Sequence, residues 1–226
     1  MTSIYQRALG ADFARLHPKM QWRFGFSADD GVCQIGSGVM DEVWHGRVFT
    51  VPFLKVGSTR RLLFSERGSD VPFTISNYAY RDGFGRETVT WSRRYEFPDS
   101  IGSFDATMIY STTRERIVDY LGTHQHLAVD IDCRVDEAGA MCLRSGEQRF
   151  YEGRLGFRFP MLFSGVADVR EWWEESSQQF RISVSVSNPV FGKLFGYRGR
   201  FTVTESPCAG GQIPRDVLPV REELRE

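Results

Sequence analysis

Between residues 71 and 205 the chain alternates apolar and polar side chains in a long series of short segments, and charged residues interrupt several apolar rows. Alternation of this kind is typical of β-strands, because successive side chains in a strand point to opposite faces of the sheet. Arg93 falls in the same row as Trp91, and Glu147 and Arg149 fall in the same row as Leu143. Burying an unpaired charge is costly. These rows therefore predict a sheet that surrounds a cavity dotted with polar groups.

The short turns between the segments predict a mostly antiparallel, all-β fold. We expect a closed or nearly closed β-barrel, lipocalin-like in general shape, because closure removes the exposed edges that so many strands would otherwise leave. A chain of 226 residues suits one large domain. We expect this domain to cover residues 1–206, with short helices capping it over about residues 1–24, and residues 207–226 to form a flexible tail. Ser3 and Gln6 have the spacing of a capping box at the start of a helix.

The hairpin around residues 136–140 gives a definite register for two of the strands. Matching the apolar rows places Cys133 and Cys142 on opposite faces, so the two cysteines are not expected to be cross-linked. Continuing the same register without interruption places Glu147 and Arg149 on the apolar face. The pairs it predicts are Val135 with Met141, Cys133 with Leu143, Val129 with Glu147, and Leu127 with Arg149.

Three other segments leave the pattern less regular. Residues 51–56 form a short apolar segment, residues 60–66 are predicted to be a strand, and residues 157–163 are predicted to be a short helix or a lid loop around Pro160. In the strand over residues 166–173, one parity turns Asp168 and Arg170 inward and the other turns Glu171 inward. Either parity therefore places at least one charge inside the barrel.

Composition excludes several classes of function. The 28 basic and 29 acidic residues give a net charge of −1, and no basic stripe favours nucleic acid. No apolar stretch approaches the roughly 20 residues that span a bilayer, and the first residues lack a secretory signal. We therefore expect a cytoplasmic protein without membrane insertion. The four cysteines show no CxxC spacing, which favours free thiols in a reducing compartment.

Motifs for cofactors and nucleophiles are absent from the sequence. There is no GxSxG elbow, no Walker loop and no GxGxxG ahead of a helix, so no cofactor is expected. His124 and His126 have the alternate spacing that would let two imidazoles share a metal ion. No histidine follows them, and His126 has the parity of the outer face. We therefore expect structural or surface histidines and no metal site.

The candidate site residues follow from the inward charges and the aromatic rows. Glu147 and Tyr78 are the candidate catalytic residues, because a carboxyl on an apolar wall has its pKa raised toward neutrality and a tyrosine can transfer a proton. An adjacent Arg149 would oppose that rise. Two alternatives need no ligand: a buried ion pair of Glu147 with Arg93 or Arg149, or positions at a wet barrel mouth. The candidate ligand-binding residues are Arg93, Arg149, Trp91, Tyr80, Tyr151 and Phe159.

Four stretches carry a resemblance to a known family: residues 77–91 (NYAYRDGFGRETVTW), 116–126 (RIVDYLGTHQH), 144–153 (RSGEQRFYEG) and 191–199 (FGKLFGYRG). Over about residues 3–204 the chain resembles a bacterial family catalogued as domain of unknown function 4166. The resemblance implies a bacterial cytoplasmic domain. It brings no activity and no catalytic residues that can be transferred to positions here.

Two functions fit these expectations. In the first, the barrel folds a mostly apolar small molecule into a reactive shape, as a cofactor-independent cyclase or isomerase of bacterial natural-product metabolism, with Glu147 or a tyrosine moving a proton and Arg93 or Arg149 holding negative charge. In the second, the barrel is a non-catalytic, lipocalin-like carrier or sensor of a hydrophobic metabolite. A weaker alternative is a module that docks to another protein.

Overall fold

The computed structural model describes residues 2–46, 60–62, 64–159, 164–208 and 213–226. Within them, eleven strands form one antiparallel sheet. The strands are β1 (Val32–His45), β2 (Gly68–Arg81), β3 (Glu87–Phe97), β4 (Ser100–Ser111), β5 (Arg116–Leu121), β6 (Leu127–Val135), β7 (Met141–Glu152), β8 (Leu155–Phe159), β9 (Val166–Glu174), β10 (Gln179–Asn188) and β11 (Gly192–Pro207).

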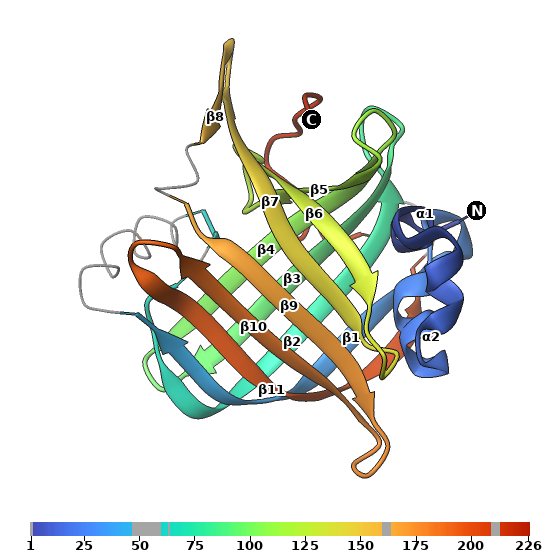
Figure 1. Cartoon of the computed structure of the whole chain (residues 1–226), viewed down its shortest axis with the longest axis vertical. Helices are drawn as coiled ribbons and strands as arrows, with labels where there is room; N and C mark the ends of the chain where they lie inside the picture. Colours follow the sequence, from blue (N-terminus) through green and yellow to red (C-terminus); the bar gives the residue numbers. More distant parts are fainter. Residues whose placement is uncertain (1, 47–59, 63, 160–163, 209–212) are drawn as a thin grey trace.

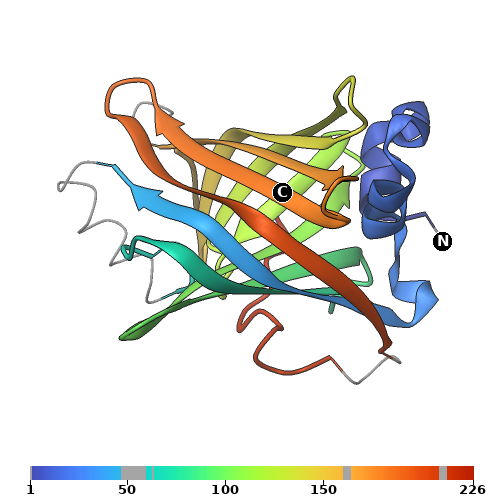
Figure 2. The ribbon, with the colours of Figure 1, turned by 90° about the horizontal axis from the view of Figure 1, so that it is seen from below.

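Ten of these strands close into a barrel (Figures 1 and 2). Consecutive strands pair from β1 to β7, β7 pairs with β9, and β9, β10 and β11 follow until β11 returns to β1. Strand β8 pairs only with the second half of β7, and the hairpin that they form projects from the ring (Figure 1). The predicted closed, antiparallel barrel is therefore confirmed.

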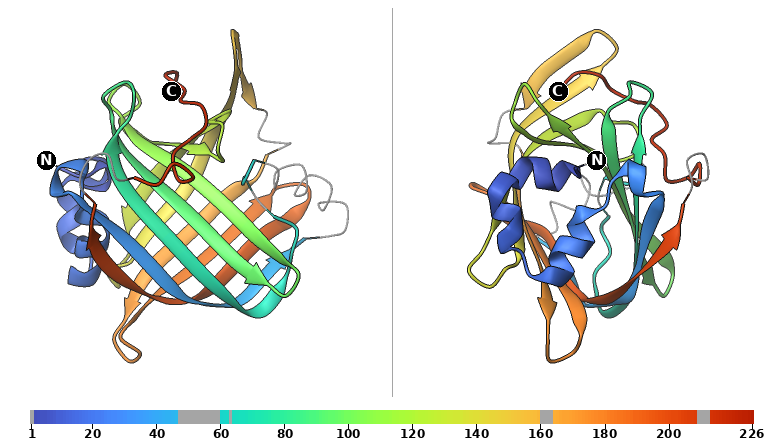
Figure 3. Two further views of the ribbon diagram at one scale, coloured as in Figure 1. Left: turned by 180° about the vertical axis from the view of Figure 1, so that it is seen from behind. Right: turned by 90° about the vertical axis from the view of Figure 1, so that its right-hand side faces the viewer.

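Short helices cover one end of the barrel, as predicted. They are α1 (Ile4–Leu9), η1 (Gly10–Arg15) and α2 (Pro18–Gly25), followed by the single turn η2 (Ala28–Asp30). Seen along the barrel, α1 and α2 lie across its opening (Figure 3). The capping box forms as predicted, since the Gln6 amide donates to Ser3 Oγ at 3.1 Å and the Ser3 amide donates to Gln6 Oε1 at 2.8 Å. Among the residues that the structure describes, no helix is long and apolar enough to cross a bilayer.

The main core lies inside the barrel beneath these helices. Tyr5 and Phe24 from the cap lie edge to face at 4.9 Å, and both rings contact Trp91 of β3. Aromatic contact of this kind joins the cap to the barrel wall over a large apolar area. The side chains of Ile75, Phe195 and Phe201 complete the same core cluster, and each is fully buried.

The less regular segments differ from prediction. Residues 60–62 and 64–66 form turns and irregular backbone, and the amides of Asp105 and Thr123 donate to the carbonyls of Arg61 and Arg60. Residues 155–159 form strand β8 rather than a helix or a loop. The short apolar segment over residues 51–56, and residues 160–163 of the predicted helix or lid, lie outside the described residues.

The C-terminal segment lies along the outer barrel wall (Figure 3, left). We expected a flexible tail over residues 207–226, whereas β11 continues to Pro207 and the described residues beyond it contact the wall. The Glu223 amide donates to Gln125 Oε1 at 2.6 Å, and the Tyr120 hydroxyl donates to the carbonyl of Arg225 at 2.9 Å. Backbone hydrogen bonds of this kind give the segment a defined position.

Candidate functional site

The interior of the barrel carries the candidate site, and β3 supplies two of its residues. Trp91 and Arg93 lie on the inner face of β3, where their side chains are 4% and 5% exposed. Register explains this placement, because Arg93 stands opposite Ile75 of β2 and Phe104 of β4, which belong to the main core. The prediction that Arg93 points into the barrel is confirmed.

A buried ion pair joins the helical cap to the barrel wall inside this space. Arg23 of α2 donates from Nε to Glu171 Oε1 of β9 at 3.0 Å and from Nη1 to Gln34 Oε1 of β1 at 2.8 Å. Both charged side chains are 1% exposed. Burial raises the pKa of Glu171, and the charge of Arg23 opposes that rise. Strand β9 therefore turns Glu171 inward, which is one of the two predicted parities.

Arg93 has a different environment from Arg23. Its Nε donates to the carbonyl of Phe104 and its Nη1 donates to the Tyr197 hydroxyl of β11, both at 3.2 Å. Its Cζ lies 3.8 Å above the centre of the Phe104 ring. Stacking on an aromatic face favours a cation when water is excluded. The guanidiniums of Arg23 and Arg93 lie 5.8 and 5.5 Å from the centre of Trp91, so the two cations share one neighbourhood.

Asp119 of β5 adds a carboxyl to the same interior. It stands opposite Met108 and Val129, both of which belong to the main core, so its side chain points inward. Burial raises the pKa of Asp119 to about 7, and the positive charge of Arg93 limits the rise. A carboxyl with a pKa near 7 exchanges its proton readily at neutral pH, which is the requirement for a general acid or base.

Several polar atoms of the interior have no hydrogen-bond partner among the described residues. They are both side-chain amide atoms of Asn77, the Tyr95 hydroxyl, Arg23 Nη2, Asp119 Oδ1 and Glu171 Oε2. Asn77 stands between Gln34 and Trp91 on the inner face of β2 and is 0% exposed. Most buried polar atoms in proteins are hydrogen-bonded, so such a group of unpaired atoms requires an explanation.

A hollow of about 730 Å³ lies where the cap meets the barrel, between α2 and the β9–β10 hairpin. Trp22 of α2, Trp173 of β9 and Phe180 of β10 contribute aromatic walls, and Lys19 lies 5.2 Å from the centre of the Trp173 ring. Trp22 is 39% exposed, whereas Phe180 is buried in the main core. The hollow therefore leads from the surface to the edge of the barrel interior.

Glu147 and Arg149 do not face this interior, which corrects the sequence-based prediction. The predicted pairs Val135 with Met141 and Cys133 with Leu143 are confirmed. The register then shifts, because Gly146 and Glu147 together oppose the single residue Asp130. A bulge of one extra residue reverses the parity of everything that follows it. Gln148 and Phe150 therefore stand opposite the inward-facing residues Val129 and Leu127, and Arg149 turns outward.

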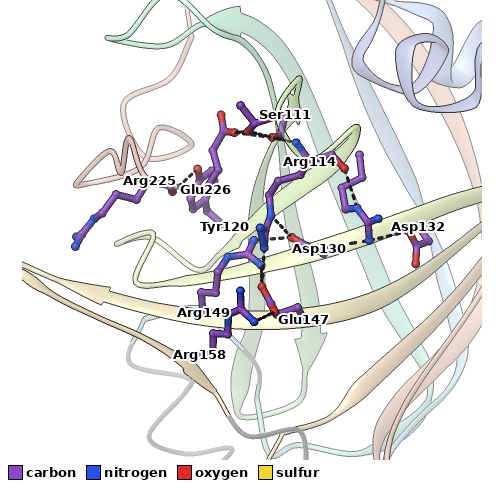
Figure 4. Close-up of polar contacts among 12 residues, drawn as sticks. Ser111, Arg114, Tyr120, Asp130, Asp132, Glu147, Arg149, Arg158, Arg225 and Glu226 are labelled. Atoms are coloured by element: carbon purple, nitrogen blue, oxygen red, sulfur yellow. Dashed lines mark hydrogen bonds and ion pairs between the residues drawn. The ribbon is translucent and has the colours of Figure 1, made fainter.

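On the outer face these residues form a charged cluster (Figure 4). Glu147 accepts from Arg114 at 2.6 Å, from Arg149 at 2.8 Å and from Arg158 at 3.2 Å. Arg149 also binds Asp130 at 2.5 Å. Hydrogen bonds first from Arg114 and then from Arg149 lower the pKa of Glu147, which is the opposite of the expected rise. Glu147 is thus a structural carboxylate here, on the opposite face of the wall from Arg93.

The three candidate tyrosines also lie outside. Tyr78 and Tyr80 alternate with the inner residues of β2 and form an outer cluster with Cys33 and Val217 of the C-terminal segment. The Tyr151 hydroxyl donates to the carbonyl of Glu226 at 3.0 Å. The predicted placement of these tyrosines inside the barrel is therefore wrong, although Tyr80 lines a hollow on the outer face with Cys208 and Leu218.

Phe159 is also away from the interior polar groups, on β8 outside the ring of ten strands, with its ring 5.8 Å from that of Phe157. His124 and His126 stack on each other at 5.6 Å. His126 Nδ1 lies within hydrogen-bond distance of the Tyr151 carbonyl and of the Glu152 carboxylate. The same nitrogen lies 2.9 Å from Arg221 Nη1. Within the described ranges, no group of three or more His, Cys, Asp or Glu side chains is arranged to hold a metal.

Sequence reasoning missed most of the interior site. Asp119 was detectable, since it falls in the same row as Ile117 and Leu121 and breaks that row as Arg93 breaks its own. Arg23 gave no such signal, because a charged residue on a short helix is ordinarily solvated. Asn77 falls in the same row as Phe73 and Ile75, so its inward position was detectable. It was not singled out, because a side-chain amide finds hydrogen-bond partners in many environments.

Fold and site together define a helix-capped, ten-stranded β-barrel with an aromatic interior that carries charges. The family model described as "Domain of unknown function (DUF4166)" matches residues 16–201, and the chain belongs to this family. A curated relative from Bacillus subtilis (strain 168), "Uncharacterized protein YndH", is 32% identical over 205 residues, which are 91% of this chain and 98% of that protein.

Proposed function

We propose that the barrel binds a mostly apolar small molecule in its interior. The observation that carries this proposal is the group of unpaired polar atoms on Asn77, Tyr95, Asp119, Glu171 and Arg23. Binding sites for small molecules are concave and mostly apolar, with a few polar groups that fix orientation. The interior has this composition, since aromatic and aliphatic side chains surround the polar atoms.

The hollow at the cap is the proposed route of entry. It opens at Trp22 and reaches Phe180, and Trp22 immediately precedes Arg23 of the interior ion pair. The Arg23–Glu171 ion pair, aromatic contacts and a few hydrogen bonds, among them those of His17 with Gly139 and Glu175, join the cap to the barrel. A cap held in this way can move without opening the closed ring of strands. Ligand exchange then requires only a displacement of α2 relative to β9.

Asp119 favours a catalytic version of this function. With its pKa near 7, Asp119 supplies the proton transfer that we first assigned to Glu147, and Arg93 stabilises negative charge that develops on the ligand. A cofactor-independent isomerase or cyclase of natural-product metabolism fits this pair. A carrier or sensor fits the same interior without turnover. Asp119→Asn distinguishes the two, because a catalyst would retain ligand and lose turnover.

Binding is tested with the neutral dye Nile red and the full chain. Asn77→Leu removes two interior polar atoms and adds volume, so the dye is expected to bind at least about tenfold more weakly. Glu147→Gln is the matched control on the outer face and should bind the dye as the wild type does. Thermal unfolding of each variant establishes that the barrel is folded. Equal dye affinity for wild type and folded Asn77→Leu would overturn the proposal.

Native mass spectrometry of the freshly purified chain gives a second, independent measurement. We expect a bound small molecule that is released on denaturation and is absent from Asn77→Leu. A ligand-free spectrum from the wild type, together with no binding of the dye, would leave the docking module as the surviving interpretation.

A further inference from the structure

We propose that the interior ligand is an amphiphilic carboxylic acid and that Arg93 binds its carboxylate. This inference rests on the proposed interior binding function and specifies the chemical class of the ligand. Its starting point is the charge of Arg93. Of the three buried arginines in the described ranges, Arg23 and Arg149 each have a carboxylate within 3.0 Å, whereas no ion pair joins Arg93 to an acidic group.

A buried cation without a counter-ion is expensive, and proteins ordinarily pair it. Two buried carboxyls interact electrostatically with Arg93: Asp119, and Glu171, which already pairs with Arg23. Burial outweighs the effect of Arg93 and raises the pKa of Asp119 to about 7, so the carboxyl is neutral in a large share of molecules at neutral pH. Asp119 therefore compensates Arg93 only in part, and a carboxylate from a ligand would complete the compensation.

The hydroxyl groups beside Arg93 are suited to the same carboxylate. The Tyr197 oxygen accepts from Arg93, which leaves the Tyr197 proton available for donation. The Tyr95 hydroxyl makes no hydrogen bond of ordinary distance and angle to a described residue, although it interacts with the Tyr197 hydroxyl, and the two rings lie 5.2 Å apart. Burial raises the pKa of Tyr95 well above its usual value, so this hydroxyl is protonated and can only donate to an anion.

The rest of the interior determines what the carboxylate is attached to. Trp91, Phe104 and Phe73 are inner-face aromatic residues of the same region, and the core cluster around them is apolar. Because only one buried arginine lacks a counter-ion, the headgroup is expected to carry a single negative charge. An aliphatic or isoprenoid chain with one terminal carboxylate meets both conditions. A multiply charged phosphate or sulfate would leave negative charge unpaired in an apolar space.

Isothermal titration calorimetry tests this with dodecanoic acid and dodecan-1-ol, which differ only in the headgroup, at concentrations below micelle formation. The delipidated full chain is expected to bind the acid at least about tenfold more tightly than the alcohol, because charge-assisted hydrogen bonds are the stronger ones. Arg93→Met should remove that preference while leaving alcohol binding within about twofold. Arg158→Met is the control, since Arg158 is exposed on the outer face.

Tyr197→Phe provides a second test in case Arg93→Met does not fold, because it removes one hydroxyl and keeps the ring. It should weaken binding of the acid several-fold and leave the alcohol unchanged. Equal affinities for acid and alcohol in the wild type, or a preference that survives in folded Arg93→Met, would overturn the carboxylate inference and leave the binding function intact. Binding of neither compound, with no binding of Nile red, would overturn both.

Discussion

At the scale of single residues, the interior differs from an ordinary barrel core in a few side chains whose protonation depends on burial. Asp119 is the clearest of them. Its neighbours in the inner face are apolar, so water does not stabilise its charge. Burial of Cys133 raises the pKa of its thiol to about 12, which makes it a poor nucleophile. The same interior thus holds one group that titrates near neutrality and one that stays inert.

Asp119→Asn should change how stability depends on pH. The pKa of Asp119 is 3.8 in the unfolded chain and about 7 in the folded barrel. Between these values the folded state holds a proton that the unfolded state has lost, so the free energy of unfolding falls as pH rises from about 4 to about 7. Asparagine cannot ionise, so at pH 8 the variant should be more stable than the wild type by about 2–4 kcal/mol.

Urea unfolding of both proteins at pH 5 and pH 8 measures this difference. Asp12→Asn, on the exposed surface, is the control and should show no such gain. A stability difference between wild type and Asp119→Asn that is the same at both pH values would show that Asp119 is already ionised at pH 5.

At the scale of elements, two local features decide how the strands and helices present their side chains. One is the ion pair that joins α2 to β9, which couples the position of the cap to the interior. The other is the bulge in β7, which moves a whole row of side chains from the inner to the outer face. Each feature involves very few residues, and each affects an entire element.

Arg23→Met should destabilise the fold, because it leaves Glu171 buried without its cation. We expect a loss of about 3–5 kcal/mol in the free energy of unfolding, measured in urea. The double variant Arg23→Met, Glu171→Leu removes both charges and should recover most of the loss, because apolar replacement of a buried ion pair is often neutral or stabilising. A double variant no more stable than the single one would indicate that packing at Arg23, rather than charge, determines the effect.

Deletion of Gly146 should be tolerated, because this register makes Gly146 the extra residue of the bulge. Without it, Glu147 alone would stand opposite Asp130, Gln148 would stay opposite Val129, and Arg149 and Tyr151 would still face outward. Gly146→Ala retains the bulge, and the added Cβ would meet the Asp130 Cβ at an ordinary 3.6 Å. Both variants should fold, and the melting temperature of Gly146→Ala should stay within a few degrees of the wild type. A deletion variant that does not fold would refute this register.

At the scale of the whole molecule, the barrel wall has two different coverings. The helical cap closes one end and contacts the interior, whereas the C-terminal segment covers part of the outer face (Figures 1 and 3). The family model ends at residue 201, before this segment. The outer tyrosines and the charged cluster therefore belong to the attachment of the C-terminal segment and to the wall itself, and the interior polar groups are separate from both.

Glu223→Ala should loosen the C-terminal segment without changing the interior. Glu223 is 5% exposed and binds both Arg221 and Arg225, whose positions it fixes against the wall. Loss of this buried carboxylate should lower the free energy of unfolding by about 1–3 kcal/mol and speed limited proteolysis after Arg221 or Arg225. Leu224→Ala, at an exposed position, is the control. Unchanged proteolysis of Glu223→Ala would show that other contacts hold the segment.

The architecture is predictable from the amino-acid sequence, because strand parity and helix capping are local properties. Alternation from residue 71 to residue 205 predicted the antiparallel barrel, the capping box at Ser3 predicted the cap, and the row around Arg93 predicted one interior charge. In the strand over residues 166–173 the pattern left open whether Glu171 or Asp168 and Arg170 face inward. The remaining features depend on contacts between segments that are distant in the chain. The bulge at Gly146 has no strong local signal, and it reversed Glu147, Arg149 and Tyr151. The pairing of Arg23 with Glu171 joins residues that are distant in sequence, and the pKa of Asp119 depends on burial that closure of the barrel creates. Parity is a property of neighbouring residues, whereas register shifts, ion pairing and desolvation depend on which segments meet.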